Sequence, residues 1–320
     1  MMEVIKRQHN QEDEIMTAST FRAAVVRHPS GPESIKLIDI PSAEPGPGQV
    51  LVAIAAAPVN PTDLGVVGGF FHDLGLINQP DYTGLGWDFA GTVQAVGEGV
   101  DLAIGTPVAG VVLGFDRDFG TYAEQLIVNA ADLAIVPEGL DLVSASTVPL
   151  NGLGAAQIVD MLGDAPTASN RLLVIGAAGA IGANVVSLAP DRGWQVTGLA
   201  RPDDEGFVRS LGAEFTDTVE RGWDAVVDAT PMQIWGLTPV RDGGIFVGVR
   251  PNLVPAVERD IAVSVLVTQS DGRQLSQLLA RAAAGRLPTR VHAVVPMAQV
   301  ADVHRAVAKG GVRGRYVLVP

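Results

Sequence analysis

The 320-residue sequence contains no cysteine, which excludes disulfides, thiolate catalysis and zinc sites with cysteine ligands. Aromatic residues make up only 5%, so a core would consist mainly of Ala, Val, Leu and Ile. Positive charge is also scarce, and a net charge of −13 argues against nucleic acid or an anionic membrane as a partner. No apolar run approaches the roughly 18 residues of a membrane-spanning helix, and the N-terminus shows no signal peptide. We therefore expect a cytoplasmic α/β protein of two domains.

The stretch of residues 171–201 carries the most informative motif. An apolar run leads into Gly176, Gly179 and Gly182, a helical pattern follows, and a second apolar run ends at Arg201. A glycine turn lets the backbone approach a pyrophosphate, and the following helix points its positive end at the phosphates. The motif therefore predicts a dinucleotide-binding unit. The alternative is that the glycines only permit close packing of a strand against a helix.

Arg201 indicates which dinucleotide binds. NAD-binding units usually carry an Asp or Glu about 20 residues after the glycines, where it accepts hydrogen bonds from the ribose hydroxyls. Here the corresponding residue is a cation, which can bind a 2′-phosphate. Asp203 and Asp204 follow closely and are the alternative ribose ligands, but they lie beyond Pro202 and are more typical of a helix start. The sequence favours NADPH as the cofactor.

The first half of the chain has the pattern of a β-rich domain. Residues 1–20 are polar without periodicity, which predicts a flexible extension. Short strand-like runs separated by Pro- and Gly-rich turns follow, at residues 21–26, 34–40, 49–59, 87–96, 107–113 and 121–128. Their spacing predicts a partly open β-barrel. The glycine-rich segment 65–86 predicts a loop.

From Ser144 the pattern changes to strands that alternate with helices. Helical spacing covers residues 144–162, 205–211 and 272–284, and further strand-like runs cover residues 225–228, 245–249 and 261–267. Such alternation predicts a doubly wound parallel sheet. The last run, residues 315–319, needs a sheet to join, and the nearest is that of the first domain. The nucleotide-binding domain would then be an insertion, with residues 147–284 flanked by 21–146 and 285–320.

Several further motifs occur in the same order as in a known superfamily. They are residues 59–63 (VNPTD), 86–91 (GWDFAG), 96–100 (VGEGV), 120–124 (GTYAE), the turn 177–182 and residues 310–315 (GGVRGR). Together they resemble the medium-chain dehydrogenase/reductase superfamily, in its zinc-free quinone oxidoreductase (zeta-crystallin-like) and enoyl reductase branch. The resemblance covers residues 21–320.

The resemblance implies a GroES-like catalytic domain, a Rossmann cofactor domain and a cofactor in the cleft between them. It implies cofactor contacts from the glycine turn, from the ends of later strands and from the C-terminal motif, namely Gly176, Ala178, Gly179, Ala180, Ile181, Gly182, Arg201, Thr230, Gly248, Val249 and Arg315. Zinc alcohol dehydrogenases of the superfamily carry His-Glu where this chain has Trp87-Asp88. With no cysteine either, neither zinc site can be built, so we expect no metal.

Without a metal, hydride transfer to an activated C=C bond is easier to catalyse than alcohol oxidation. The protein needs only to orient the reactants and to donate a hydrogen bond to the substrate carbonyl oxygen. Asn60 matches the Asn that this branch carries near the nicotinamide, although it could equally cap the turn before Pro61. Asp63 is more typical of a helix cap than of an acid. Enoyl-thioester reductases have a proton-donating Tyr where this chain has Phe71. His72 and Tyr82 are the candidates to replace it, unless they are ordinary surface residues.

Two functional hypotheses follow. The first is an NADPH-dependent, zinc-independent reductase of enones, quinones or enoyl thioesters. The second is an NADPH-binding protein with weak or no catalysis, and a zinc-free carbonyl reductase is a further possibility. The apolar run from Ile261 to Val267 predicts an edge strand, which in the resembling family pairs with its copy, so we expect a homodimer.

Overall fold

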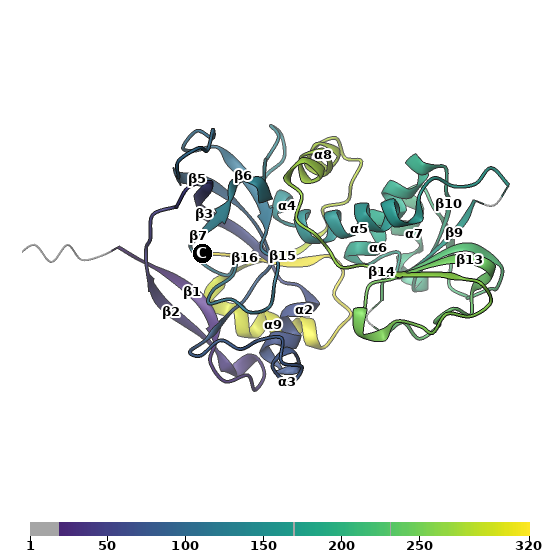
Figure 1. The fold of residues 1–320 in the computed structure, drawn as a ribbon, viewed down its shortest axis with the longest axis horizontal. Coiled ribbons are helices and arrows are strands. Elements are labelled where there is room, and N and C mark those ends of the chain that lie inside the picture. Colours follow the sequence, from purple (N-terminus) through teal and green to yellow (C-terminus); the bar gives the residue numbers. More distant parts are fainter. Residues whose placement is uncertain (1–18, 169, 231) are drawn as a thin grey trace, which may run out of the picture.

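The computed structural model describes residues 19–168, 170–230 and 232–320, and the chain in these ranges forms two lobes, each built on its own β-sheet (Figure 1). The predicted extension lies outside the described residues up to position 18. No helix in the described part of the chain is long and apolar enough to cross a membrane.

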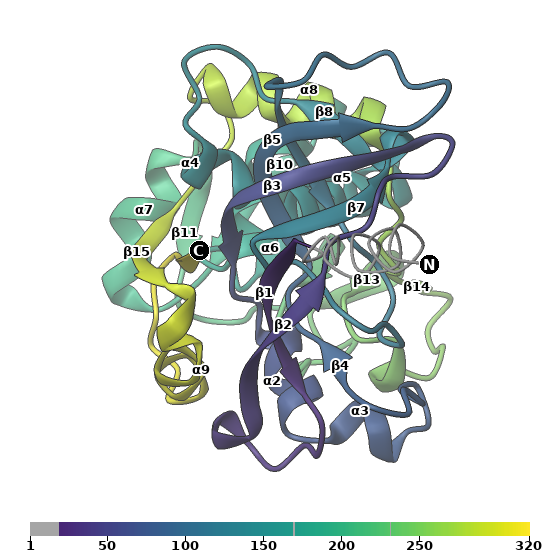
Figure 2. The same ribbon diagram turned by 90° about the vertical axis from the view of Figure 1, so that its left-hand side faces the viewer.

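The first lobe is a β-barrel-like arrangement of antiparallel strands (Figure 2). Its strands are β1 (Thr20–Val26), β2 (Ile35–Pro41), β3 (Gln49–Pro58), β4 (Thr83–Gly84), β5 (Asp88–Val96), β6 (Pro107–Val111), β7 (Gln125–Asn129), β8 (Leu133–Ile135), β15 (Val291–Pro296) and β16 (Arg315–Val319). β1, β2 and β4 form a small sheet, and the others form a seven-stranded sheet in which β3 is central. Along β3 every second residue, from Val50 to Ala56, points into the core, as the alternating sequence predicts.

The end of the chain completes this first sheet. β16 pairs antiparallel with β3, where Leu318 lies opposite Ala57, and parallel with β15. The prediction that the terminal strand joins the first sheet is therefore confirmed. β15 and the helix between the two strands, α9 (Val300–Ala308), were not predicted.

The second lobe contains a six-stranded sheet in which all neighbouring strands are parallel. Its strands are β9 (Arg171–Ile175), β10 (Gln195–Leu199), β11 (Glu214–Thr216), β12 (Trp223–Asp228), β13 (Val240–Gly248) and β14 (Ala262–Val265). The helices of this half of the chain are α4 (Leu142–Ser146), α5 (Pro149–Leu162), α6 (Ala180–Leu188), α7 (Glu205–Ser210) and α8 (Gly272–Ala283). The strand order β11-β10-β9-β12-β13-β14 starts in the middle and winds outward both ways, as in a Rossmann fold. The predicted fold class is confirmed.

One segment differs from its prediction. Residues 65–86, expected to form a loop, include the end of α2 (Pro61–Val67), the short helix α3 (Phe70–Asp73) and β4. Gly69, with φ of +87°, adopts the left-handed conformation that separates the two helices. Gly65 leaves room for the ring of Phe71, which would lie 2.6 Å from an added Cβ. The glycines therefore shape two short helices instead of preventing them.

His304 on α9 is fully buried, and neither ring nitrogen has a hydrogen-bond partner among the described residues. Its ring packs edge-on against Tyr122, with centroids 6.0 Å apart. Burial lowers the pKa of His304 below 6.5, although the charge of Asp63 opposes the shift. Below about pH 6.5 the unfolded chain therefore binds a proton that the folded protein does not, and stability falls as the pH is lowered.

As the pH is lowered, we expect the free energy of unfolding to fall less steeply in His304→Leu than in the unmodified protein, by up to about 1.4 kcal/mol per pH unit. Urea unfolding at several pH values between about 5 and 7.5 measures the free energy of unfolding of both proteins. His28, which is exposed, provides a matched control as His28→Leu. The same decline in His304→Leu as in the unmodified protein would show that His304 does not cause it.

Candidate active site and cofactor cleft

The glycine turn connects β9 to α6 and brings the helix close to the strand end. Gly176 has a φ of +80°, and the amides of Gly176 and Ala177 both donate to the carbonyl of Leu199 on β10. A Cβ at Gly182 would lie 2.2 Å from the carbonyl oxygen of Gly176, so only glycine fits there. The turn is thus tight, and the N-terminal end of α6 is left facing the space beside it.

That space is a cleft of about 420 Å³ with walls from both lobes. Its lining comes from the glycine turn, from α5 and α6, from the residues around Asn60 and from the C-terminal segment, and includes Asn60, Thr147, Asn151, Ala178, Gly179, Ala180, Asn184, Phe207, Arg290, Gly311, Gly314 and Arg315. The structure therefore brings together five of the predicted site residues: Asn60, Ala178, Gly179, Ala180 and Arg315. Its size and two-lobed wall suit an extended ligand.

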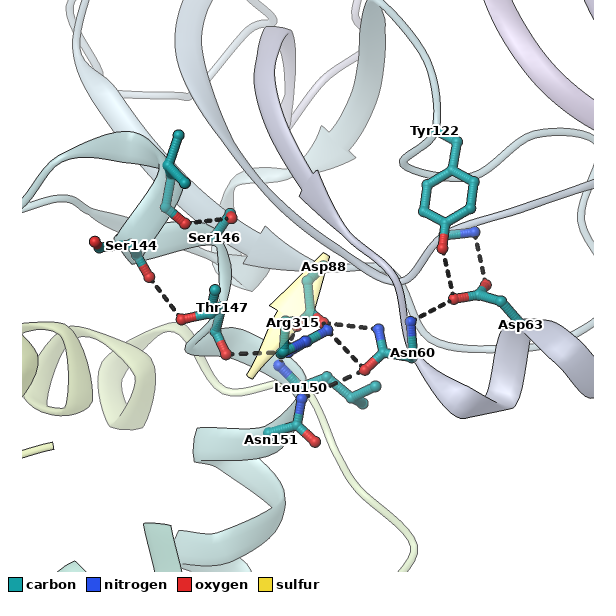
Figure 3. A network of polar contacts seen from close by, with 12 residues as sticks. Asn60, Asp63, Asp88, Tyr122, Ser144, Ser146, Thr147, Leu150, Asn151 and Arg315 are labelled. Carbon is teal, nitrogen blue, oxygen red and sulfur yellow. Dashed lines mark hydrogen bonds and ion pairs between the residues drawn. The ribbon is translucent and has the colours of Figure 1, made fainter. Parts of the chain in front are cut away.

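A buried polar network holds the wall of the cleft around Asn60 (Figure 3). The guanidinium of Arg315 donates to the Asn60 side-chain oxygen at 2.7 Å and pairs with Asp88 at 2.7 Å. Asn60 in turn donates from its side-chain nitrogen to Asp88 at 3.0 Å. Asp88 also accepts from the backbone of Leu150, and Arg315 donates to the carbonyl of Thr147, so the network ties the first lobe to α5.

Asp63 belongs to a second buried cluster beside this network. Its carboxylate accepts from the Asn60 backbone at 2.9 Å, from the Tyr122 hydroxyl at 2.8 Å and from the Gly86 backbone at 2.9 Å. Burial, and then the charge of Asp63, raises the pKa of Tyr122 well above 10. The bond from the Asn60 amide makes Asp63 the third residue of a capping box at the start of α2, which agrees with the predicted role in helix capping.

Neither predicted proton donor lines the cleft. His72 lies on α3, with its Nε2 3.5 Å from the hydroxyl of Thr83. The ring of Tyr82 lies beneath Arg27, with the guanidinium carbon 5.9 Å from the ring centroid. Phe71 packs against Phe115, with ring centroids 4.1 Å apart. The structure does not bring His72 or Tyr82 together with Asn60, and their catalytic roles stay predictions.

Of the remaining predicted cofactor residues, Thr230, Gly248 and Val249 lie at or just beyond the carboxyl ends of the neighbouring parallel strands β12 and β13. Thr230 follows β12 and donates to Asp228 through its amide and its hydroxyl, at 3.0 and 2.6 Å. Gly248 ends β13 and Val249 follows it, while Ile181 packs its side chain partly into the core. Burial raises the pKa of Asp228, whose second oxygen has no described partner. Ligands of open parallel sheets bind at this edge.

Arg201 is 59% exposed and lies 3.3 Å from Asp204. Asp204 is only 2% exposed, and Arg313 of the C-terminal segment binds its other oxygen at 2.6 Å. Burial opposes the ionisation of Asp204, but its bonds with Arg313 and Arg201 prevail and lower its pKa. Two guanidinium groups from different lobes thus meet at one buried carboxylate. No local pattern in the sequence indicates the role of Arg313, which lies 109 residues from Asp204.

Comparison with known proteins agrees with this architecture. Residues 46–138 match the alcohol dehydrogenase GroES-like domain, and residues 203–318 match the zinc-binding dehydrogenase family. A glucose 1-dehydrogenase of Thermoproteus tenax is 31% identical over 268 residues, which cover 71% of this chain and 76% of that protein. The chain belongs to the medium-chain dehydrogenase/reductase superfamily. This superfamily consists of oxidoreductases, and among its members the chain is similar to quinone oxidoreductases and enoyl reductases.

Two other relatives and one structure show how this member of the superfamily is related to others. The NADPH-dependent alkenal/one oxidoreductase of Arabidopsis thaliana chloroplasts is 28% identical over 291 residues, 85% of this chain and 72% of that protein. The pikromycin polyketide synthase component PikAII of Streptomyces venezuelae is 34% identical over 170 residues, 53% of this chain but only 4% of that much longer protein. The quinone oxidoreductase of Coxiella burnetii shares the fold, with a TM-score of 0.83 at 24% identity over 94% of this chain and all of the other.

The site of this dehydrogenase/reductase fits a nicotinamide dinucleotide. Ala178, Gly179 and Ala180 line the cleft at the N-terminal end of α6, where phosphates bind, and Asn184, which also lines it, has a buried side-chain oxygen without a described partner. The residues do not fit zinc. The chain has no cysteine, and in the described residues no three His, Asp or Glu side chains gather where they could hold a metal.

Proposed function

We propose that the protein is an NADPH-dependent, zinc-independent oxidoreductase that transfers hydride to an activated C=C bond of an enone, quinone or enoyl thioester. The observation that carries the NADPH assignment is the pairing of Asp204. A carboxylate that reads ribose hydroxyls must have free oxygens, but those of Asp204 are buried against Arg201 and Arg313. Arg201 remains 59% exposed and pairs with Asp204 through its Nε alone, so its two terminal nitrogens can bind a 2′-phosphate.

The proposed chemistry rests on Asn60. A bound nicotinamide would supply the hydride from its C4 position. Only one hydrogen of the Asn60 amide is used, in the bond to Asp88, and the other has no acceptor among the described residues. Because Asp88 and Arg315 fix the amide, this second N–H can donate to a substrate carbonyl oxygen as negative charge collects there. The names of the alkenal/one oxidoreductase and quinone oxidoreductase relatives support this substrate class.

Further parts of the proposal concern the whole molecule. We assign residues 21–146 and 285–320 to the catalytic domain and residues 147–284 to the cofactor domain. We also propose a homodimer through β14, because it is the outer strand of its sheet and alternates exposed with half-buried residues. A monomeric mass in light scattering would contradict the dimer.

The alternative of an NADPH-binding protein with little catalysis is favoured by one observation. The described residues that line the cleft include no His, Asp, Glu or Lys, and the ring of Tyr316 packs against His292 with ring centroids 4.7 Å apart. A reductase would then receive its proton from water.

Turnover assays distinguish these possibilities. We expect the purified protein to oxidise NADPH, followed at 340 nm, with at least one of a panel of quinones, alkenals and enoyl thioesters. The product should be the saturated carbonyl compound or the hydroquinone. Tight NADPH binding without turnover across the panel would establish the binding-protein alternative, and an allylic alcohol as product would indicate carbonyl reduction.

A further inference from the structure

Arg290 lies just before β15 and reaches across the cleft from the first lobe to the second. Its guanidinium carbon is 4.2 Å from the centre of the Phe207 ring on α7. Both residues line the cleft. The backbone of Arg290 is held in place, because its carbonyl accepts from the Arg315 amide at 2.9 Å.

Gly314 makes room for this arrangement. A Cβ at that position would lie 2.7 Å from the Arg290 carbonyl oxygen and 3.0 Å from its Cγ. Gly314 also has a φ of +87°, a conformation that other residues avoid. The C-terminal motif of this chain is thus shaped around Arg290 as well as around Arg315.

The guanidinium of Arg290 lacks an acceptor. Its Nη1 is buried without a hydrogen-bond partner, and Arg290 forms no ion pair within the described residues. The two arginines of the C-terminal motif differ from Arg290 in having an anionic partner. Arg313 pairs with Asp204, and Arg315 pairs with Asp88. Leaving a buried guanidinium nitrogen without an acceptor is costly, and such a nitrogen in a half-buried arginine of a ligand cleft indicates that an anionic acceptor comes with the ligand.

The position within the cleft identifies the class of anion. Ala178, Gly179 and Ala180 line the same cleft and form the N-terminal end of α6, where phosphates bind to backbone amides. A guanidinium forks readily onto phosphate oxygens, and its flat face remains free to stack on an aromatic ring such as Phe207.

We propose that Arg290 binds a phosphate of the dinucleotide from the side of the first lobe, opposite the glycine turn. This inference rests on the proposed cofactor. The bound dinucleotide is then held by both lobes, and its phosphate supplies the hydrogen-bond acceptor that Arg290 lacks. The pyrophosphate and the 2′-phosphate share this chemistry, and binding measurements distinguish them.

The test compares Arg290→Met, which keeps length and apolar bulk, with Arg286→Met, an exposed arginine on the same segment that does not line the cleft. Dissociation constants for NADPH, NADH and adenosine 2′,5′-bisphosphate are measured by calorimetry. We expect Arg290→Met to weaken NADPH binding by about tenfold to hundredfold, and Arg286→Met to leave it unchanged. Equal weakening of NADPH and NADH identifies the pyrophosphate, whereas weakening of NADPH and the bisphosphate alone identifies the 2′-phosphate.

A second comparison tests charge against packing. Phe207→Leu removes the ring but keeps the cation, so it should cost less NADPH affinity than Arg290→Met. Raising NaCl from about 50 to 300 mM should weaken NADPH binding less in Arg290→Met than in the unmodified protein, because one screened charge is gone. Unchanged NADPH affinity in Arg290→Met would overturn the inference. Equal losses of affinity and equal salt dependence in Arg290→Met and Phe207→Leu would overturn it as well. If the unmodified protein binds neither dinucleotide, the proposed function itself fails.

Discussion

Replacing Arg315 with Met should lower the free energy of unfolding by about 3–5 kcal/mol. The guanidinium is 7% exposed and is the only cation paired with Asp88 among the described residues, and Asp88 is completely buried. Removing the cation leaves a charged carboxylate in the interior with only the Asn60 amide and the Leu150 backbone as donors. Urea unfolding at pH 7, analysed by linear extrapolation, measures the loss.

Two variants test the cause of this loss. Arg305 is 42% exposed and pairs with Glu33 and Asp302, so Arg305→Met should barely move the unfolding midpoint. Arg315→Met combined with Asp88→Asn should be more stable than Arg315→Met alone, because the second change removes the unpaired charge. A double variant less stable than the single one would mean that the buried charge does not explain the effect.

The same substitution should also disturb the reactive end of the cleft. Arg315 donates to the Asn60 oxygen, so its loss frees one side of the amide that is proposed to bind the substrate carbonyl. The stability of the first lobe and the orientation of Asn60 therefore depend on one network (Figure 3). For this reason activity measurements on Arg315→Met need to be made well below its unfolding temperature.

Much of the fold could be predicted because its signals are local. The alternation in β3 follows from the two-residue period of a strand, and the turn at Gly176 follows from glycine spacing next to an apolar run. The segment after Gly65 was predicted wrongly for a local reason too. Its glycine content favours a loop, whereas Pro61 at the start of α2 and the left-handed Gly69 define two short helices.

The candidate site was only partly predictable, because its contacts join distant parts of the chain. Asn60 meets Arg315 across 255 residues, and Asp204 meets Arg313 across 109. No sequence period encodes such pairs. His72 and Tyr82 are close to Asn60 in the sequence. In the structure, however, His72 on α3 lies next to Thr83, and neither His72 nor Tyr82 lines the cleft. Arg290, which lines the cleft together with Arg315, stands in a segment without any recognisable motif.

Replacing Arg201 with Ser should raise the dissociation constant for NADPH by about tenfold to hundredfold and leave that for NADH nearly unchanged. The 2′-phosphate would lose a charge-assisted contact, whereas NADH has no group at that position. The ratio of the two constants, measured by calorimetry at low salt, reports this change directly. Stability should be little affected, because Arg201 is mostly exposed.

The matched control is Arg209→Ser. Arg209 on α7 is 55% exposed and pairs with Glu205 much as Arg201 pairs with Asp204, but it does not follow the end of β10, where the ribose-binding residue is expected. Arg209→Ser should not change the ratio of the dissociation constants for NADPH and NADH. Equal weakening of NADPH and NADH in Arg201→Ser would contradict a role at the 2′-phosphate. A preference of the unmodified protein for NADH would contradict the NADPH assignment itself. Asp204 would then have to give up its ion pair with Arg313, which lowers its pKa, in order to bind the ribose.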